Sequence, residues 1–130
     1  MAGVTIQMAT TKRHSLQEIH EKIHHIVGAE QISKSVQTIN HVVIWTLTYE
    51  KCFFRTGNYT SMTIVLTEHN QDQTACVVSS GGGGGILNQS LGANRKFAKE
   101  CVQVLECCGF SVIESDLNVK DKGLVERLLE

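Results

Sequence analysis

The stretch that decides the fold is HVVIWTLTYEKCFFRTGNYTSMTIVLT, residues 41–67. Its first half places apolar side chains at every second position from Val43 to Tyr49, and its second half repeats the alternation from Met62 to Leu66. A period of two in β-branched and aromatic residues predicts strands with one buried face. The intervening Arg-Thr-Gly-Asn carries the glycine and asparagine that a reversing turn needs for positive φ. We therefore expect the two strands to pair as a hairpin.

Segments on either side of this hairpin extend the expected sheet. Alternation over residues 4–8 predicts a strand at the start of the chain, and residues 33–39 form a weaker, short strand pattern. A turn at 69–73 leads into TACVVSS (74–80), which we expect to be the third strand of an antiparallel meander. A last short strand is expected near 110–113.

Two segments carry the periodicity of amphipathic helices. Ser15 and Glu18 form the capping-box pattern that begins a helix over residues 15–27, where apolar residues recur in steps of three and four. A second stripe predicts a helix over 93–108, and a glycine follows each helix in the position that a C-cap favours. A third apolar stripe at 124–129 predicts a helix that docks on the rest of the chain.

These elements predict an α+β fold with two layers, in which two main helices pack on one face of a mostly antiparallel sheet. The 130 residues, 42% hydrophobic and 19% charged, are typical of one compact domain spanning 1–130. There is no internal repeat, and the absence of proline leaves no sign of a stiff interdomain linker.

The charge balance and apolar runs exclude some partners. The net charge of -1 provides no basic field for nucleic acid or acidic lipid. No run approaches the roughly 18 apolar residues that span a bilayer, so we expect a soluble, cytoplasmic protein. The odd number of cysteines, without a Cys-x-x-Cys pair, argues against a disulfide framework and a zinc ribbon, and favours small, mostly buried thiols. The five are Cys52, Cys76, Cys101, Cys107 and Cys108.

The segment HEKIH carries the zinc-peptidase pattern, with His20 and His24 as ligands and Glu21 as general base. The extended form of the signature is excluded, because Val27 and Glu30 occupy the places of its glycine and third histidine. A third ligand would have to come from a strand or loop; the candidates are His41, Glu50 and His69. The preferred interpretation is that the two imidazoles border the apolar stripe of a helix and hold no metal. A zinc-dependent hydrolase is the alternative.

The run Gly81–Gly85 raises the question of a phosphate or nucleotide cradle, because exposed amides bind anions at helix N-termini. No Lys-Ser or Lys-Thr follows at the P-loop spacing, and ILNQSL (86–91) stands before the expected helix start at 92–94. We therefore favour a flexible connection, or a hairpin turn into a short strand ILNQS, over an anion site. Ser79, Ser80 and Asn88 could offer hydroxyl and amide groups to a ligand there.

A longer pattern runs from Tyr-Glu-x-x-x-x-Arg-x-Gly-Asn at 49–58, through Ser-Gly-Gly at 80–82, to Gly-Ala at 92–93. In these motifs the chain resembles a family of small uncharacterised bacterial proteins, filed as a domain of unknown function, over roughly residues 33–108. The resemblance implies no established activity, and Asn94-Arg95 departs from the acidic helix start of that family. The matching positions are Tyr49, Glu50, Arg55, Gly57, Asn58, Ser80, Gly81, Gly82 and Gly92.

The expected function is non-enzymatic binding of a protein partner or a small ligand, without a cofactor. The expected contact surface is the rim formed by the 55–58 turn and the 79–92 loop. Its candidate residues are Glu50, Arg55, Asn58, Ser80, Gly81, Gly82 and Asn88. Glu50 and Arg55 could also form a cross-strand ion pair, which contributes little when exposed. An exposed strand edge would favour self-association, because unpaired edge amides recruit another strand.

Overall fold

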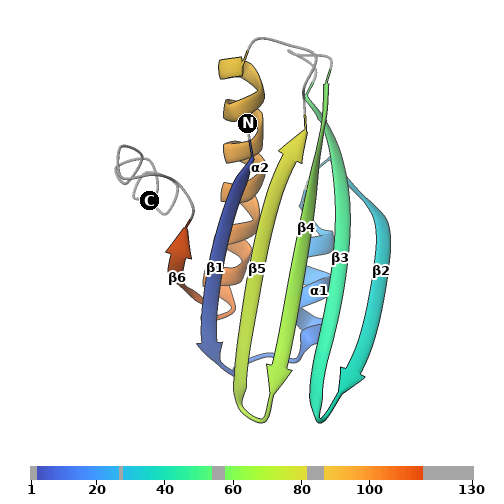
Figure 1. Cartoon of the computed structure of the whole chain (residues 1–130), viewed down its shortest axis with the longest axis vertical. Helices are drawn as coiled ribbons and strands as arrows, with labels where there is room; N and C mark the ends of the chain where they lie inside the picture. The colour runs from blue at the N-terminus through green and yellow to red at the C-terminus, as the bar shows by residue number, and fades with distance from the viewer. Residues whose placement is uncertain (1–2, 27, 54–57, 82–86, 116–130) are drawn as a thin grey trace.

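The computed structural model describes residues 3–26, 28–53, 58–81 and 87–115. In this part of the chain six strands and two helices follow one another (Figure 1). In chain order they are β1 (Val4–Thr11), α1 (Leu16–His24), β2 (Ala29–Ile39), β3 (Val42–Phe53), β4 (Asn58–His69), β5 (Asp72–Gly81), α2 (Leu87–Cys107) and β6 (Ser111–Ser115).

All described strands belong to one sheet in the order β2-β3-β4-β5-β1-β6, and every pair in it is antiparallel. The predicted hairpin of β3 and β4 is confirmed, with Trp45 opposite Leu66 and Tyr49 opposite Met62. The predicted meander is confirmed as well, since β5 pairs with β4. β1 lies between β5 and β6, so the start and end of the described chain meet at one side of the sheet (Figure 1).

Two tight turns join the strands at one end of the sheet (Figure 1). Asn40 and His41 connect β2 to β3 with φ of 47° and 69°, and Asn70 connects β4 to β5 with φ of 57°. Turns whose central residues have positive φ match the right-handed twist of the paired strands, and asparagine tolerates that conformation best. The turn predicted at 69–73 is thus confirmed, while the one at 40–41 carries no glycine that would have announced it.

The helix ends differ from the predicted ones. The Ser15 side chain accepts a bond of 3.1 Å from the Glu18 amide, as expected of a cap, but the Glu18 carboxylate turns to His14 at 3.0 Å. α1 ends at His24, three residues before the expected end. α2 begins at Leu87, so the expected strand ILNQS is wrong, and Gly109 follows its end with φ of +96°. No helix in the described ranges is long and apolar enough to cross a membrane.

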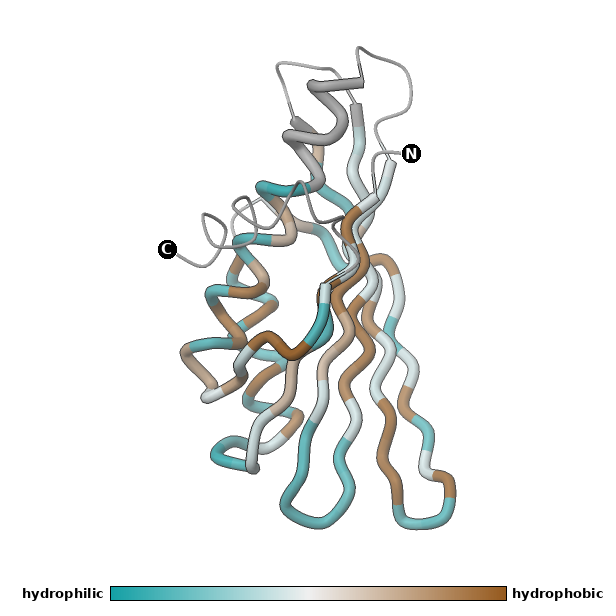
Figure 2. Tube along the Cα trace, turned by 60° about the vertical axis from the view of Figure 1, so that its left-hand side comes forward, coloured by the Kyte–Doolittle hydropathy of each residue, from teal (hydrophilic) through white to brown (hydrophobic). Residues whose placement is uncertain are grey.

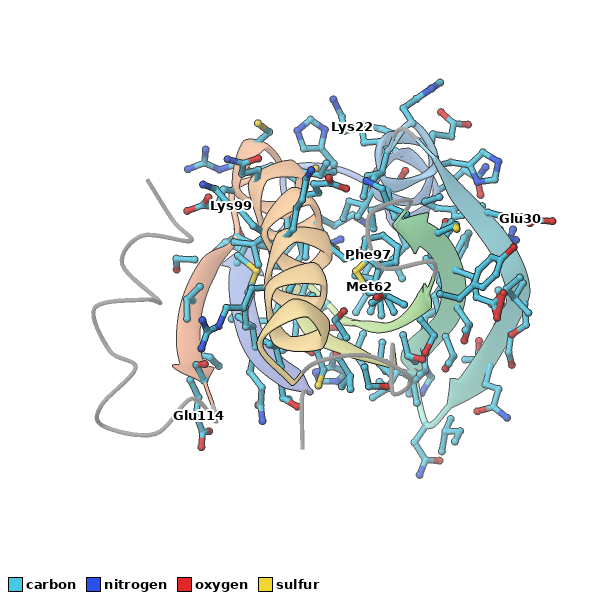
Figure 3. The ribbon with its side chains drawn as sticks, turned by 90° about the horizontal axis from the view of Figure 1, so that it is seen from above. Lys22, Glu30, Met62, Phe97, Lys99 and Glu114 are labelled. Carbon is cyan, nitrogen blue, oxygen red and sulfur yellow. The ribbon has the colours of Figure 1, made fainter. Side chains whose placement is uncertain are left out.

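The core lies between the helices and one face of the sheet. Figure 2 shows both helices on the same side of the strands, and Figure 3 shows the sheet curving around α2. Phe97 of α2 and Met62 of β4 lie in this interior and are fully buried (Figure 3). Burial of the predicted apolar rows is therefore what holds helix to sheet, at about 25 cal/mol for each Å² of apolar surface removed from water.

The expected two-layer α+β class is wrong, because the described chain is predominantly an antiparallel sheet with two helices that cover only part of it. Strands β3 and β4 have 12 residues each, whereas α1 has 9. The error is largest at β2, expected as a short strand at 33–39 and found to have 11 residues. Every residue of β2 from Ile32 to Ile39 is exposed, so the helices leave this part of the strand uncovered.

Candidate functional site

The edge strand β2 carries three of the five large apolar side chains that are exposed in the described chain; the other two are Tyr59 and Ile113. Ile32, Val36 and Ile39 are 51%, 50% and 54% exposed, although each is a large apolar side chain. Val36 and Ile39 are three residues apart in the strand and point to opposite faces of the sheet, so a strand added along this edge would contact both faces. This group of three residues is called the β2 apolar edge below.

Val36 lies at the end of a row of apolar side chains that runs across the sheet from the core to the open edge of β2. Across the sheet, Ala75, Leu66, Trp45 and Val36 lie opposite one another in neighbouring strands. Leu66 is fully buried, Trp45 is half-buried and Val36 is half-exposed, so burial decreases steadily toward the edge. The Lys34 ammonium lies 4.6 Å from the centre of the Trp45 ring, in cation–π contact. The positive charge is thereby drawn inward from the strand edge.

The backbone of β2 also presents free hydrogen-bonding groups. The residues that flank a two-residue turn form a hydrogen-bonded pair, and bonded and non-bonded pairs then alternate along an antiparallel ladder. Ile39 and Val42 flank the Asn40-His41 turn, so their amides and carbonyls point at each other. Counting back along β2, the backbone groups of Lys34, Val36 and Thr38 point away from β3, toward the open edge.

The histidine motif lies on the helix side of the same strands. His20 Nε2 lies 2.7 Å from the Gln31 side-chain oxygen, which also accepts a bond of 3.2 Å from the Tyr49 hydroxyl. The rings of His20 and His24 have their centres 5.6 Å apart, and the Trp45 ring is equally close to His20. The motif thus belongs to a polar and aromatic cluster that fastens α1 to β2 and β3, and burial raises the pKa of Tyr49 to about 12.

The three sequence candidates for a further metal ligand lie elsewhere. His41 and His69 are at the hairpin ends, and Glu50 follows the buried Tyr49, so its side chain points to the opposite face of the sheet. Glu21 is on the exposed side of α1. Within the ranges that the structure describes, no three His, Cys, Asp or Glu residues gather as a metal site. The zinc alternative stays a prediction.

The predicted rim lies at the end of the sheet opposite the tight turns. Glu50, Ser61 and Ser80 lie opposite one another on β3, β4 and β5, and the Ser61 hydroxyl lies 3.4 Å from the Ser80 carbonyl oxygen. Glu50 also lies opposite Glu30, an unfavourable like-charge pair. Gly81 has φ of +116°, and a side chain there would crowd the Tyr59 carbonyl oxygen at 3.0 Å.

The rest of the predicted rim is only partly described. Asn58 begins β4 and Asn88 lies in the first turn of α2, whereas Arg55 and Gly82 are outside the described residues. The structure therefore does not test the Glu50–Arg55 ion pair. It does correct one premise: α2 begins at Leu87, so ILNQSL does not separate the glycine run from the helix. Phosphate binding at Gly81–Gly85 stays a prediction.

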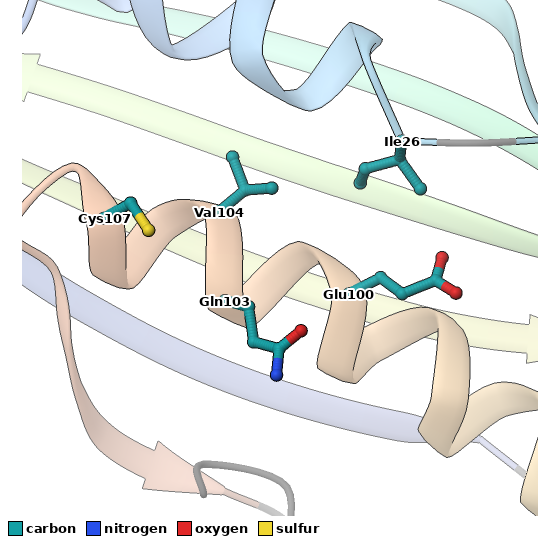
Figure 4. Close-up of a pocket in the computed structure, with 5 residues that line it drawn as sticks. All are labelled: Ile26, Glu100, Gln103, Val104 and Cys107. Atoms are coloured by element: carbon teal, nitrogen blue, oxygen red, sulfur yellow. The ribbon is translucent and has the colours of Figure 1, made fainter.

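Two hollows also lie on the described surface. A groove of about 350 Å³ between α1 and α2 is mainly apolar (Figure 4). Its lining residues are Ile26, Glu100, Gln103, Val104 and Cys107. A second hollow of about 600 Å³ near the turn end of β1 and β5 is lined by polar side chains, among them Thr10, Arg13 and Asp72. In the first hollow, Cys107 and Glu100 are seven residues apart on α2, about 10 Å along the helix axis, and the Glu100 carboxylate is already bonded to Lys51.

Sequence reasoning missed the ion pair that joins β3 to α2. The Lys51 ammonium lies 2.8 and 2.7 Å from the two oxygens of Glu100, and the side chains are only 14% and 27% exposed. The partners are 49 residues apart in sequence, so no local spacing announces the pair. Of the cysteines, Cys101 and Cys108 are buried as expected, but Cys107 is exposed.

The comparison with known proteins places the chain in a family. Residues 1–109 match DUF6054, a family of unknown function, and the chain belongs to that family. No curated protein matches the sequence. The predicted membership of a family of unknown function is confirmed, while the motifs that suggested it and a bacterial origin stay predictions.

Proposed function

We propose that this protein is a non-enzymatic binding domain that takes up an extended protein segment along the edge of β2. The observation that carries the proposal is the β2 apolar edge, Ile32, Val36 and Ile39, beside backbone groups that point away from β3. Strand addition uses main-chain hydrogen bonds for affinity and alternate side-chain pockets for specificity. The half-buried Trp45 next to Val36 supplies an apolar contact for the incoming strand.

The proposed surface differs from the rim expected at 55–58 and 79–92. What supports the edge of β2 is its exposed apolar side chains together with backbone groups that point away from β3. The rim remains a second contact surface for the same binding function. Ser61 and Ser80 on the adjoining strands would lie next to a segment held there.

The experiment is a selection of displayed extended peptides against the full chain. Val36→Pro removes the outward amide hydrogen without touching the bonds to β3, and proline is tolerated on an edge strand. Selected peptides should bind this variant about 10-fold more weakly, the size expected for one lost main-chain hydrogen bond. Val36→Thr keeps the amide and the branched shape and is the matched control. Peptides that bind all three chains equally would show that the edge is not the site.

We further propose that binding needs no metal. His20 Nε2 is already engaged by Gln31, so a cation would have to break that bond before using His20 and His24 together. Zinc analysis of protein purified without an affinity tag tests this. About one zinc per chain, lost in a variant with both histidines replaced by alanine, would overturn it and support the hydrolase alternative.

A further inference from the structure

The edge of β2 fits a second copy of this chain in one particular register. We propose that two chains pair through antiparallel β2 strands around a twofold axis at Val36, forming one continuous sheet. This inference rests on the proposed function, because it names the extended segment that the edge accepts. It commits to a partner whose sequence and geometry are both known.

The symmetry of the edge limits the registers that are allowed. The pairing of β2 with β3 is irregular between Gln31 and Ser33. After that point in the chain, only Lys34, Val36 and Thr38 have backbone groups that point away from β3. When the twofold axis passes through Val36, each of these three residues can form hydrogen bonds with the second copy. Val36 lies opposite Val36 of the second copy, and Lys34 of each copy lies opposite Thr38 of the other. This register pairs every outward residue of the segment. An axis at Ser35 would bring Lys34 opposite Val36 and leave Thr38 at the irregular Ile32.

Charge excludes another register and favours this one. An axis at Lys34 would set the two ammonium groups directly opposite each other, and like charges in that position are destabilising. With the axis at Val36 each lysine faces a threonine. Lys34 also lies over its own Trp45 ring at 4.6 Å, which keeps its charge away from the seam. The single charged side chain between Ser33 and Ile39 therefore does not oppose pairing.

Packing supplies the driving force. The core row of Ala75, Leu66 and Trp45 ends at Val36, which is 50% exposed in the single chain. Around the axis this row meets its symmetry copy, so Val36 packs on Val36 with a tryptophan on each side. The end of the apolar row, half-exposed in one chain, becomes the middle of a longer row in the dimer. Its apolar surface is thereby removed from water.

The other edge of the sheet is less suited to the same role. β6 has only 5 residues, and its pairing with β1 shifts register between Gln7 and Met8. Short strands and irregular pairing are devices that protect an edge from added strands. Among the described strands, β2 therefore offers the longer regular edge for pairing.

Sedimentation of the full chain over a concentration series measures the association. Val36→Lys sets two added ammonium groups opposite each other at the axis, and should raise the dimer dissociation constant at least about 10-fold. Gln37→Lys is the matched control: it adds the same charge one residue away, on the opposite face, and should change the constant less than about 3-fold. Unchanged far-ultraviolet circular dichroism shows that both variants are folded.

Cysteine cross-linking reads the register directly, in a background where the exposed Cys107 is replaced by serine. Ser35 of one copy lies opposite Gln37 of the other in a non-hydrogen-bonded pair, where the Cα atoms are about 4.5 Å apart and a disulfide fits. A mixture of Ser35→Cys and Gln37→Cys chains should cross-link under mild oxidation, and neither chain alone should do so. Cross-linking of Ser35→Cys alone, or of Gln37→Cys alone, would place the axis at that residue and overturn the register.

A monomer at every concentration would overturn the dimer. If edge-dependent peptides still bind that monomer, the proposed binding function stands without it. If the wild-type chain neither dimerises nor takes up peptides that Val36→Pro rejects, both proposals fail.

Discussion

The ion pair between Lys51 and Glu100 provides a quantitative test of what holds α2 to the sheet. Its two contacts are 2.8 and 2.7 Å long, and the Lys51 ammonium also lies 5.7 Å from the centre of the Phe97 ring. Hydrogen bonds to charged groups contribute about 1.5–3 kcal/mol when buried, and exposed ion pairs about 0–1 kcal/mol. Because the side chains are 14% and 27% exposed, we expect a coupling energy between these limits, about 1.5 kcal/mol.

A double-mutant cycle with Lys51→Met and Glu100→Gln isolates this coupling from the other contacts of each residue. Urea unfolding gives the four free energies, and each kcal/mol should shift the midpoint of thermal unfolding by about 3–5 °C in a domain of this size. Lys12 and Glu68, whose side chains are 35% and 18% exposed, are the comparison pair, because they make one contact of 3.1 Å instead of two. Their coupling should be about 0.5 kcal/mol. A Lys51–Glu100 coupling no larger than that of the comparison pair would refute the reasoning.

Two further predictions concern titration and reactivity. Cys107 is exposed, whereas burial raises the pKa of the Cys101 thiol. A brief pulse of alkylating reagent should therefore label Cys107 in the native protein and Cys101 only after unfolding. Early labelling of Cys101, detected by mass spectrometry, would contradict this. Burial, together with the nearby charge of Cys101, raises the pKa of Tyr49 from 10.0 to about 12. The protein should therefore keep the full stabilisation linked to this shift below the pKa of tyrosine in the unfolded chain, and lose it as the pH rises through about 12. Phenolate absorbance of the wild type minus that of Tyr49→Phe measures the transition, and a difference curve centred near 10 would disprove it.

The sequence predicted the elements whose burial pattern is regular. β3 and β4 carry apolar residues at every second position on the face that packs on the helices, where Leu47, Ile64 and Met62 are fully buried. The first residues of β2, 29–32, were missed because alanine and glutamine, not large apolar residues, occupy the half-buried positions Ala29 and Gln31, so no apolar alternation marks them. Its strand conformation comes from pairing with β3 and from the Asn40-His41 turn, both of which lie outside its own sequence pattern.

Prediction of the candidate sites failed where partners come from distant parts of the chain. His20 was expected at the flank of a helix stripe and is half-buried there, but its partner Gln31 lies on the strand that the pattern missed. The start of α2 was placed too late because Gly92 lies inside the helix, and glycine normally disfavours a helix interior by about 1 kcal/mol. The buried apolar side chains that follow in α2, among them Phe97 and Leu105, offset the free-energy cost of the glycine.

The two edges of the sheet together explain why pairing through β2 would stop at two chains. Isologous pairing around a twofold axis uses the same edge in both copies, so no β2 edge remains to recruit a third. Growth would then require β6, which is short and irregularly paired. The register shift next to Ile32 also limits regular pairing to residues 33–39 of β2, and Val36 lies at the centre of this segment. A sheet that left a long regular edge on both sides would form fibres, whereas one regular edge and one blunted edge specify a closed pair.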